Sequence, residues 1–104
     1  MSRRRLAALL AVLAATAVIP ARAETVVVTV VNMAFSPAKI SAKVGDTVEW
    51  VNKDPFVHTA TVKGGFDVPL PVKASGRIVL DKAGSFAYFC RYHPNMKGQI
   101  TVAK

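Results

Sequence analysis

The sequence predicts an all-β domain, an antiparallel Greek-key β-sandwich of about seven to eight short strands. Segments rich in β-branched residues, or alternating between polar and apolar residues, recur every 8–12 residues or so, and Gly, Pro and Asp separate them. After residue 23 no segment shows the apolar spacing of a helix over three turns. A long segment with two prolines, residues 66–76, suits a Greek key, in which the chain must cross between two sheets.

Each expected strand has its own local pattern. Residues 25–31 are dense in β-branched side chains, which favour extended structure. Residues 39–44 and 47–52 alternate between polar and apolar side chains with a period of two, as half-buried strands do, and Gly45-Asp46 forms the turn between them. Later strands are shorter and are bounded by Gly or Pro. The expected strands are residues 25–31, 39–44, 47–52, 58–62, 77–80, 85–89 and 98–102.

The connections are expected where breakers cluster. Asp54-Pro55 marks residues 52–56 as a loop, and Gly64-Gly65 ends the short strand that begins at His58. Residues 66–76 are expected to form a connecting loop or an irregular edge, because proline cannot donate a hydrogen bond to a sheet.

The first 23 residues have the pattern of an export signal. Residues 3–5 are all Arg, and residues 6–19 form an uncharged, mostly apolar run of 14. That run is shorter than the roughly 20 residues needed to span a bilayer. Residues 21–23 then carry small side chains at the two positions that a signal peptidase reads. We expect residues 1–23 to be a cleaved signal peptide and residues 24–104 to be a single periplasmic domain. An uncleaved membrane anchor is the alternative, and the export route stays open.

Charge and cysteine content exclude several classes of protein. Four of the 14 basic residues lie in the leader, so the remaining ten outnumber the six acidic residues by only four. They form no basic cluster, which argues against nucleic-acid binding. One Cys excludes an internal disulfide framework. Small exported domains often depend on disulfides or metals, so a metal site becomes the natural expectation.

One constellation carries the chemistry of a metal site. Cys90, His93 and Met96 follow the spacing C-x2-H-x2-M, between the expected strands at 85–89 and 98–102. The only other histidine, His58, lies 32 positions before Cys90. Pro94 should stiffen the short loop because its ring fixes φ.

The donor types favour copper. A trigonal plane of two imidazoles and one thiolate, with a distant thioether, is the arrangement of electron-transfer copper. Thiolate and thioether stabilise Cu(I), whereas imidazole accepts Cu(II). Zinc prefers closed tetrahedral sites with more Cys or a carboxylate, although it could occupy the site adventitiously.

These residues resemble a known family, the cupredoxins or type 1 blue copper proteins. The resemblance rests on Phe35-x-Pro37, Val44-Gly45-Asp46-x-Val48-x-Trp50-x-Asn52-x-Asp54, the single His58, and Cys90-x2-His93-x2-Met96. The short ligand loop looks most like that of the amicyanin group. The resemblance implies a cupredoxin-like sandwich in which His58, Cys90 and His93 are equatorial copper ligands and Met96 is axial. It also implies that electrons pass through the edge of His93, ringed by Phe56, Pro94 and Pro69.

The function that the resemblance implies is electron transfer. It suggests a monomeric periplasmic protein that cycles Cu(II)/Cu(I) between redox partners such as an amine dehydrogenase, a c-type cytochrome or both, without stable membrane insertion. An enzyme is not expected, because all four ligands come from protein and no open metal position is evident. A copper chaperone or storage protein and a metal-free interaction module are the alternatives.

Three further residues lie next to the expected ligands in the sequence. Thr59 stands where Asn is frequent in the family, and its hydroxyl is a candidate for the hydrogen bond that bridges the ligand loops. Arg91 and Lys97 are either solvated charges or a basic surface that faces acidic groups on a redox partner.

Overall fold

A computed structural model describes residues 22–104, which form nine strands. The predicted signal peptide falls almost wholly on residues 1–21, outside the described part. No helix long and apolar enough to cross a bilayer is found in residues 22–104. The strands are β1 (Thr25–Val31), β2 (Ala34–Ser36), β3 (Lys39–Lys43), β4 (Thr47–Asn52), β5 (His58–Thr61), β6 (Asp67–Leu70), β7 (Ser75–Val79), β8 (Gly84–Phe89) and β9 (Lys97–Ala103).

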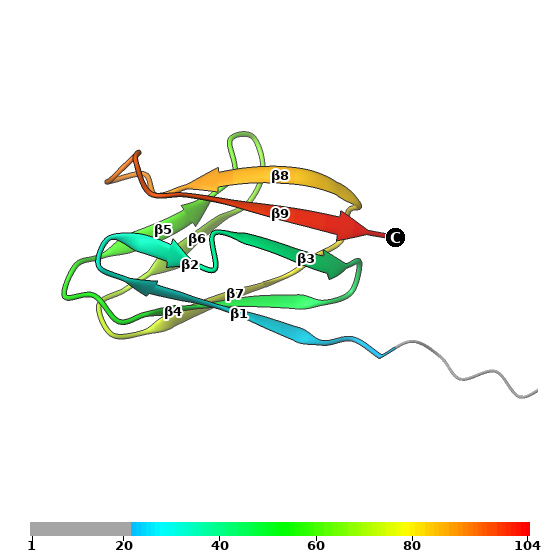
Figure 1. Cartoon of the computed structure of the whole chain (residues 1–104), viewed down its shortest axis with the longest axis horizontal. Helices are drawn as coiled ribbons and strands as arrows, with labels where there is room; N and C mark the ends of the chain where they lie inside the picture. The colour runs from blue at the N-terminus through cyan, green and yellow to red at the C-terminus, as the bar shows by residue number, and fades with distance from the viewer. Residues whose placement is uncertain (1–21) are drawn as a thin grey trace, which may run out of the picture.

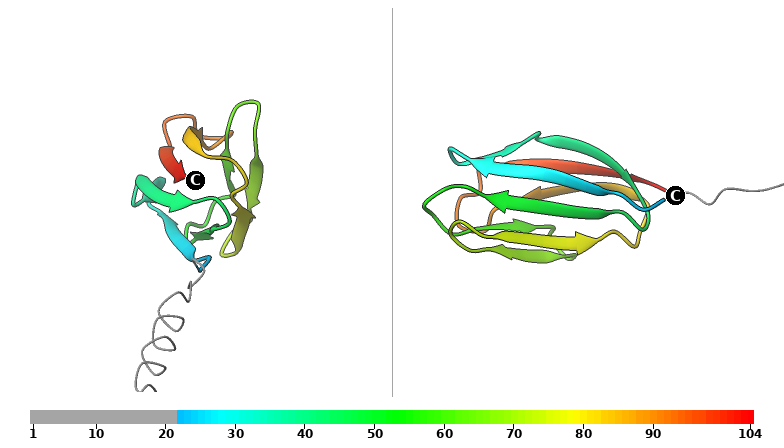
Figure 2. Two further views of the ribbon diagram at one scale, coloured as in Figure 1. Left: turned by 90° about the vertical axis from the view of Figure 1, so that its right-hand side faces the viewer. Right: turned by 90° about the horizontal axis from the view of Figure 1, so that it is seen from below.

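The strands form two packed sheets, as the views in Figures 1 and 2 show. One sheet has the order β2-β1-β4-β7, and the other has the order β3-β9-β8-β5-β6. This confirms the all-β sandwich, with slightly more strands than expected. The sheets are mixed rather than wholly antiparallel as expected, because β1 pairs with β4 and β3 pairs with β9 in parallel. Parallel neighbours arise here because the chain leaves one sheet for the other before it returns beside an earlier strand.

Two strands lie where the sequence predicted none. The three-residue β2 is too short to show a period-two pattern, and it pairs with β1 across a tight turn. β6 lies in the predicted connection and contains Pro69. It is the edge strand of its sheet, next to β5, which is where a proline within a strand is tolerated. Of the two alternatives expected for residues 66–76, the irregular edge therefore describes the structure better than the connecting loop.

A cluster of aromatic rings fills the centre of the sandwich. Trp50 and Tyr88, both almost fully buried, pack edge to face with ring centroids 5.5 Å apart, and Phe35 packs on Tyr88 at 4.7 Å. Gly98 lies opposite Tyr88 in the β8–β9 pairing, and a Cβ there would collide with the tyrosine ring. Aromatic pairs of this kind add packing energy to the burial of large apolar surfaces, so they form a rigid base for the loops at either end.

Four loops meet at one end of the sandwich. The β1–β2, β4–β5, β6–β7 and β8–β9 connections all lie at the left in Figure 1, and the C-terminus lies at the opposite end. The right-hand view in Figure 2 shows the same separation. The expected metal ligands lie at the first residue of β5 and in the β8–β9 connection, so the fold brings them to this end.

The opposite end holds Asp46, a nearly buried carboxylate with a structural role. Its two oxygens accept hydrogen bonds from the backbone N–H groups of Glu24 and Lys43, each at 2.9 Å. These donors, with a smaller contribution from the Lys43 charge, lower the pKa of Asp46 although burial opposes the shift. The carboxylate therefore stabilises the fold at neutral pH.

We expect stability to fall on acidification in a manner that depends on Asp46. Because its pKa is lowered from 3.8, its contribution is fully present above about pH 4 and is lost as the pH falls through the lower folded-state value. Urea unfolding of the copper-free protein between pH 2.5 and 6 measures this. The Asp46→Asn variant should be less stable at pH 6 and lose less stability on acidification. Parallel curves for the two proteins would contradict this role.

Candidate metal centre

The structure brings His58, Cys90 and His93 together. His58 is the first residue of β5, and Cys90 follows the last residue of β8. β5 and β8 are neighbours in one sheet, so the two side chains meet where β5 begins and β8 ends. His93 and Met96 complete the short connection to β9, as predicted.

Three potential donor atoms form a compact triangle. The Nδ1 atoms of His58 and His93 are 3.2 Å apart, and Cys90 Sγ lies 3.7 Å and 3.6 Å from them respectively. A point equidistant from the three atoms lies about 2 Å from each, which is the length of a metal–imidazole bond. The triangle therefore has the size that a trigonal metal ion requires.

The loop that carries three of the predicted ligands is closed by its own backbone. Cys90 N–H donates to the carbonyl of Met96, His93 N–H to that of Cys90, and Met96 N–H to that of His93, at 3.1, 3.3 and 2.8 Å. Each of the three residues thus both donates and accepts one of these backbone hydrogen bonds, which together form a closed ring. Pro94 lies between two of them and restricts the backbone further. The loop is organised around the same residues that the spacing singled out.

Burial differs among the four residues in a way that matters for chemistry. His58 and Cys90 are completely buried, and Met96 is 3% exposed. His93 is the only one of the four that is partly exposed. A buried thiolate and thioether with two imidazoles, one at the surface, are the soft mixed donors of electron-transfer copper, so the residues fit the ion.

The second ring nitrogen of His58 has a partner of its own. Nε2 lies 2.8 Å from the Oδ2 atom of Asp54, and Asp54 also accepts backbone N–H groups from Asn32 and Met33 at 2.7 and 2.9 Å. Burial alone would raise the pKa of Asp54, but the donors from Met33, His58 and Asn32 outweigh it and hold the pKa below its ordinary value. The carboxylate is ionised at neutral pH.

Asn52 ties the β4–β5 and β6–β7 connections together beneath the site. Its side-chain Nδ2 lies 2.8, 3.0 and 3.2 Å from the carbonyl oxygens of Phe56, Leu70 and Pro71. Its Oδ1 accepts the backbone N–H of Asp54 at 3.0 Å. The sequence motif included Asn52, but its bonding depends on Leu70 and Pro71, which lie 18 and 19 positions later. No local pattern could have shown that role.

A chain of polar side chains secures the other side of the ligand loop. Thr59 Oγ1 accepts the backbone N–H of Arg91 at 2.9 Å, which confirms that its hydroxyl bridges the two ligand segments. The hydroxyl groups of Thr59 and Thr61 are hydrogen-bonded to each other, and Thr61 donates to the Asp67 carboxylate. Arg91 Nε also donates to Asp67, at 3.2 Å. The Thr61 hydroxyl, followed by the Arg91 guanidinium, lowers the pKa of Asp67 although desolvation opposes the shift. Arg91 is therefore paired with Asp67, although its side chain stays half exposed.

Exposed apolar side chains gather on the same loops. Each of the four connections at this end contributes at least one exposed large apolar residue. These residues, which we call the end patch, are Met33, Phe56, Val57, Val72 and Tyr92. Pro94 is also exposed, whereas Pro69 projects from the edge strand β6 rather than from these loops. Exposed apolar surface around a partly exposed ligand is suited to contact with another protein.

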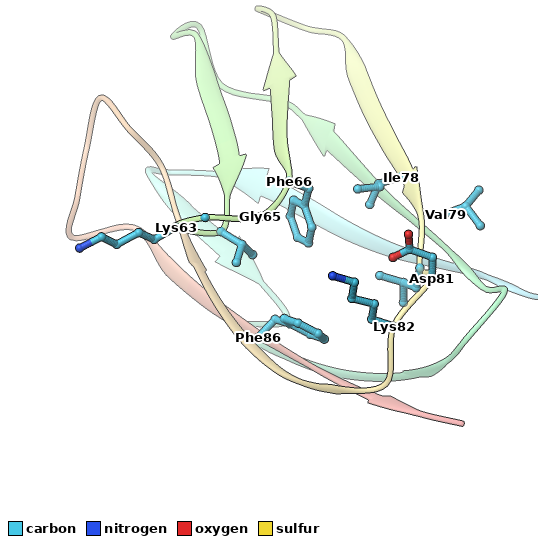
Figure 3. Close-up of a pocket in the computed structure, with 11 residues that line it drawn as sticks. Lys63, Gly65, Phe66, Ile78, Val79, Asp81, Lys82 and Phe86 are labelled. Atoms are coloured by element: carbon cyan, nitrogen blue, oxygen red, sulfur yellow. The ribbon is translucent and has the colours of Figure 1, made fainter.

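A separate cavity of about 580 Å³ lies away from these residues. It opens between the β5–β6 connection and the β7–β8 region, with the rings of Phe66 and Phe86 on its walls (Figure 3). Lys63, Asp81 and Lys82 are the charged residues that line it, and none of the predicted metal ligands does so. The cavity is distinct from the candidate metal centre.

The sequence profile, the similar proteins and the similar solved structures all point to the same family. A sequence profile described as a cupredoxin-like domain matches residues 4–102. An amicyanin from Paracoccus versutus is 35% identical over 87 residues, which are 77% of this chain and 66% of that protein. The match therefore spans just under two thirds of that relative's length.

Two further comparisons cover a larger share of the similar protein. An amicyanin-alpha from Methylorubrum extorquens is 31% identical over 102 residues, which cover 91% of this chain and 86% of that protein. A solved structure of a Cu(I) form of an amicyanin variant superposes with a TM-score of 0.67 at 27% identity, covering 86% of this chain and 88% of that one. Family and donor set together identify a type 1 copper site.

Proposed function

This chain belongs to the cupredoxin-like family and is most similar to amicyanins, and from that premise we propose that it is a type 1 copper electron-transfer protein. The observation that carries the proposal is the triangle formed by two imidazole nitrogens and one thiol sulfur in a buried, rigid setting. Copper supplies a one-electron Cu(II)/Cu(I) couple when bound. The protein supplies fixed donors, so that little rearrangement accompanies gain or loss of the electron.

We assign the ligands residue by residue. His58 Nδ1, Cys90 Sγ and His93 Nδ1 would hold the ion as the equatorial donors of the family, and Met96 would supply the axial thioether. Support comes from the three short separations among the equatorial atoms and from the backbone ring that joins Cys90, His93 and Met96. With four donors from protein there is no open position for a substrate, so the proposed role is that of a carrier rather than an enzyme.

Electrons enter and leave through His93. It is the one proposed ligand with exposed surface, and the end patch surrounds the loops beside it. Exposed basic residues lie on or beside the same loops, and Lys73 Nζ donates to the backbone carbonyl of Lys53 at 2.7 Å. These residues are Lys53, Lys73, Lys97 and Arg91, the last of which is paired with Asp67. Apolar side chains interspersed with basic ones fit a redox partner that presents acidic groups, such as an amine dehydrogenase or a c-type cytochrome.

We also propose that residues 1–23 are removed on export and that the monomeric carrier acts in the periplasm. Residues 22–24 are exposed and β1 begins only at Thr25, so cleavage after Ala23 would leave intact all the strands of the described part of the chain. A domain of this size without disulfides gains stability from a bound metal, which suits an exported carrier.

The test is spectroscopic and kinetic. The protein, expressed from the full sequence and isolated from the periplasm, is loaded with Cu(II) and examined by visible absorption and EPR. We expect an intense thiolate-to-copper band, a narrow copper hyperfine splitting, and retention of copper through repeated one-electron reduction and oxidation. An ordinary tetragonal signal would contradict the proposed site. Rapid release of Cu(I) to a chelating acceptor would indicate copper handling instead.

Substitution of the axial donor has a predicted direction. In Met96→Gln a harder oxygen donor replaces the thioether and favours Cu(II), so the reduction potential should fall. A tenfold change in relative affinity corresponds to about 59 mV for a one-electron couple, and we expect a drop of at least that size. Protein-film voltammetry measures it, with Met33→Gln on the exposed β1–β2 turn as the matched control. An equal potential in both variants would argue that Met96 is not axial.

A further inference from the structure

His58 is held at both of its ring nitrogens. Its Nδ1 faces Cys90 Sγ and His93 Nδ1, while its Nε2 lies 2.8 Å from the Asp54 carboxylate. An ionised carboxylate can only accept, so the ring proton sits on Nε2 and the lone pair on Nδ1 points to the metal position. The contact with Asp54 therefore selects the tautomer that can bind a metal.

The Asp54 carboxylate is itself hydrogen-bonded to a β-turn that lies more than 20 positions earlier in the chain. Asn32 and Met33 form the two-residue connection between β1 and β2, and both have positive φ, at 53° and 61°. This hairpin geometry directs both of their N–H groups to Asp54, at 2.7 and 2.9 Å. Three N–H donors, one of them from His58, thus converge on a carboxylate that is only 4% exposed.

We propose that Asp54 is a positioning residue of the copper site: a carboxylate fixed by the β1–β2 turn that orients His58 and shifts the copper couple toward Cu(II). The proposal rests on the function proposed above. A carboxylate bonded to the outer nitrogen of a metal-bound imidazole fixes the ring and raises its basicity. A neutral acceptor would orient the ring equally well but would not add a negative charge behind it, and that difference can be measured.

The substitution Asp54→Asn removes the charge and nearly keeps the shape; its Oδ1 can still accept from His58 and Met33, while its Nδ2 then faces the N–H of Asn32 and cannot accept it. We expect the variant to bind Cu(II) 10–100-fold more weakly, the range typical for loss of an outer partner of a metal ligand. Cu(I) affinity should change less. If it does not change, a tenfold loss for Cu(II) raises the reduction potential by about 59 mV. Asp54→Glu, which restores the negative charge, should bring the potential back toward that of the wild type.

Asp67→Asn is the matched control. Asp67 is also a carboxylate near the ligand loop, but its partners are Thr61 and Arg91 rather than a proposed ligand. Its side chain is 48% exposed, so solvent screens its charge. The potential should shift less than in Asp54→Asn. Equal shifts in the two Asn variants, or no shift in Asp54→Asn, would overturn the proposal.

A second measurement needs neither copper nor a variant. In the copper-free wild-type protein at pH 8, ¹⁵N NMR of the imidazoles should place the His58 proton on Nε2, in slow exchange with water because the ring is buried. A proton on Nδ1 would overturn the proposal even if the protein binds copper normally. Conversely, the Nε2–H form in a protein that gives no type 1 spectrum would reject the copper function while leaving the Asp54–His58 bond in place.

Discussion

The Cys90→Ser variant is expected to lose the intense visible band and most of its affinity for copper. The band arises from charge transfer between a thiolate and copper, and Cys90 is the only cysteine in the chain. Serine is of similar size, but its hydroxyl is a hard, neutral donor at neutral pH. Because Cys90 is a proposed direct ligand, the loss of affinity should exceed the roughly 10–100-fold seen when an outer partner is removed.

Competition with a chelator of known affinity measures this loss, and the absorption and EPR spectra report the geometry that remains. The wild-type protein should also gain thermal stability from copper, by about 2.7 kcal/mol at a hundredfold excess over Kd, whereas the variant should gain much less. Circular dichroism of the two copper-free proteins is the control for folding. A variant that keeps the blue band would show that Cys90 is not a ligand.

The proposed ligands could be picked out from the sequence because most of them are local in sequence. Cys90, His93 and Met96 lie within seven residues, in the connection between the adjacent strands β8 and β9. Residues so near in sequence in a short connection must also be near in space. His58 followed because it is the only other histidine in the chain. The strands with clear alternation, such as β3 and β4, were predicted for the same local reason.

What surrounds the ligands could not be predicted in the same way. The partners of Asp54 lie in the β1–β2 turn, and those of Asn52 lie after β6, so both roles appear only when the sheets are assembled. β6 itself was obscured by Pro69, which is tolerated because that strand lies at an edge. Local patterns thus predict donors and strands, whereas the second layer of hydrogen bonds depends on tertiary contacts.

Asn52→Ala is expected to destabilise the fold strongly, through lost hydrogen bonds rather than through lost apolar packing. The change removes a buried amide that contacts carbonyl groups of Phe56 and Leu70 and accepts the N–H of Asp54. Each buried group left without a partner costs about 1–3 kcal/mol, so we expect a loss of about 3–5 kcal/mol. That is a large fraction of the roughly 5–15 kcal/mol that stabilises a typical domain.

Urea unfolding of the copper-free proteins measures the loss, with Asn95→Ala as the matched control. Asn95 is exposed, so the same substitution there should change stability by less than about 0.5 kcal/mol. The effect at Asn52 should also reach the copper site, because Leu70 is paired with His58 in the β5–β6 register and Asp54 holds the ring of His58. Copper affinity should therefore fall in Asn52→Ala. Equal stability in the two variants would mean that water replaces the amide, and that the loops at this end are held by the polar chain through Thr59 instead.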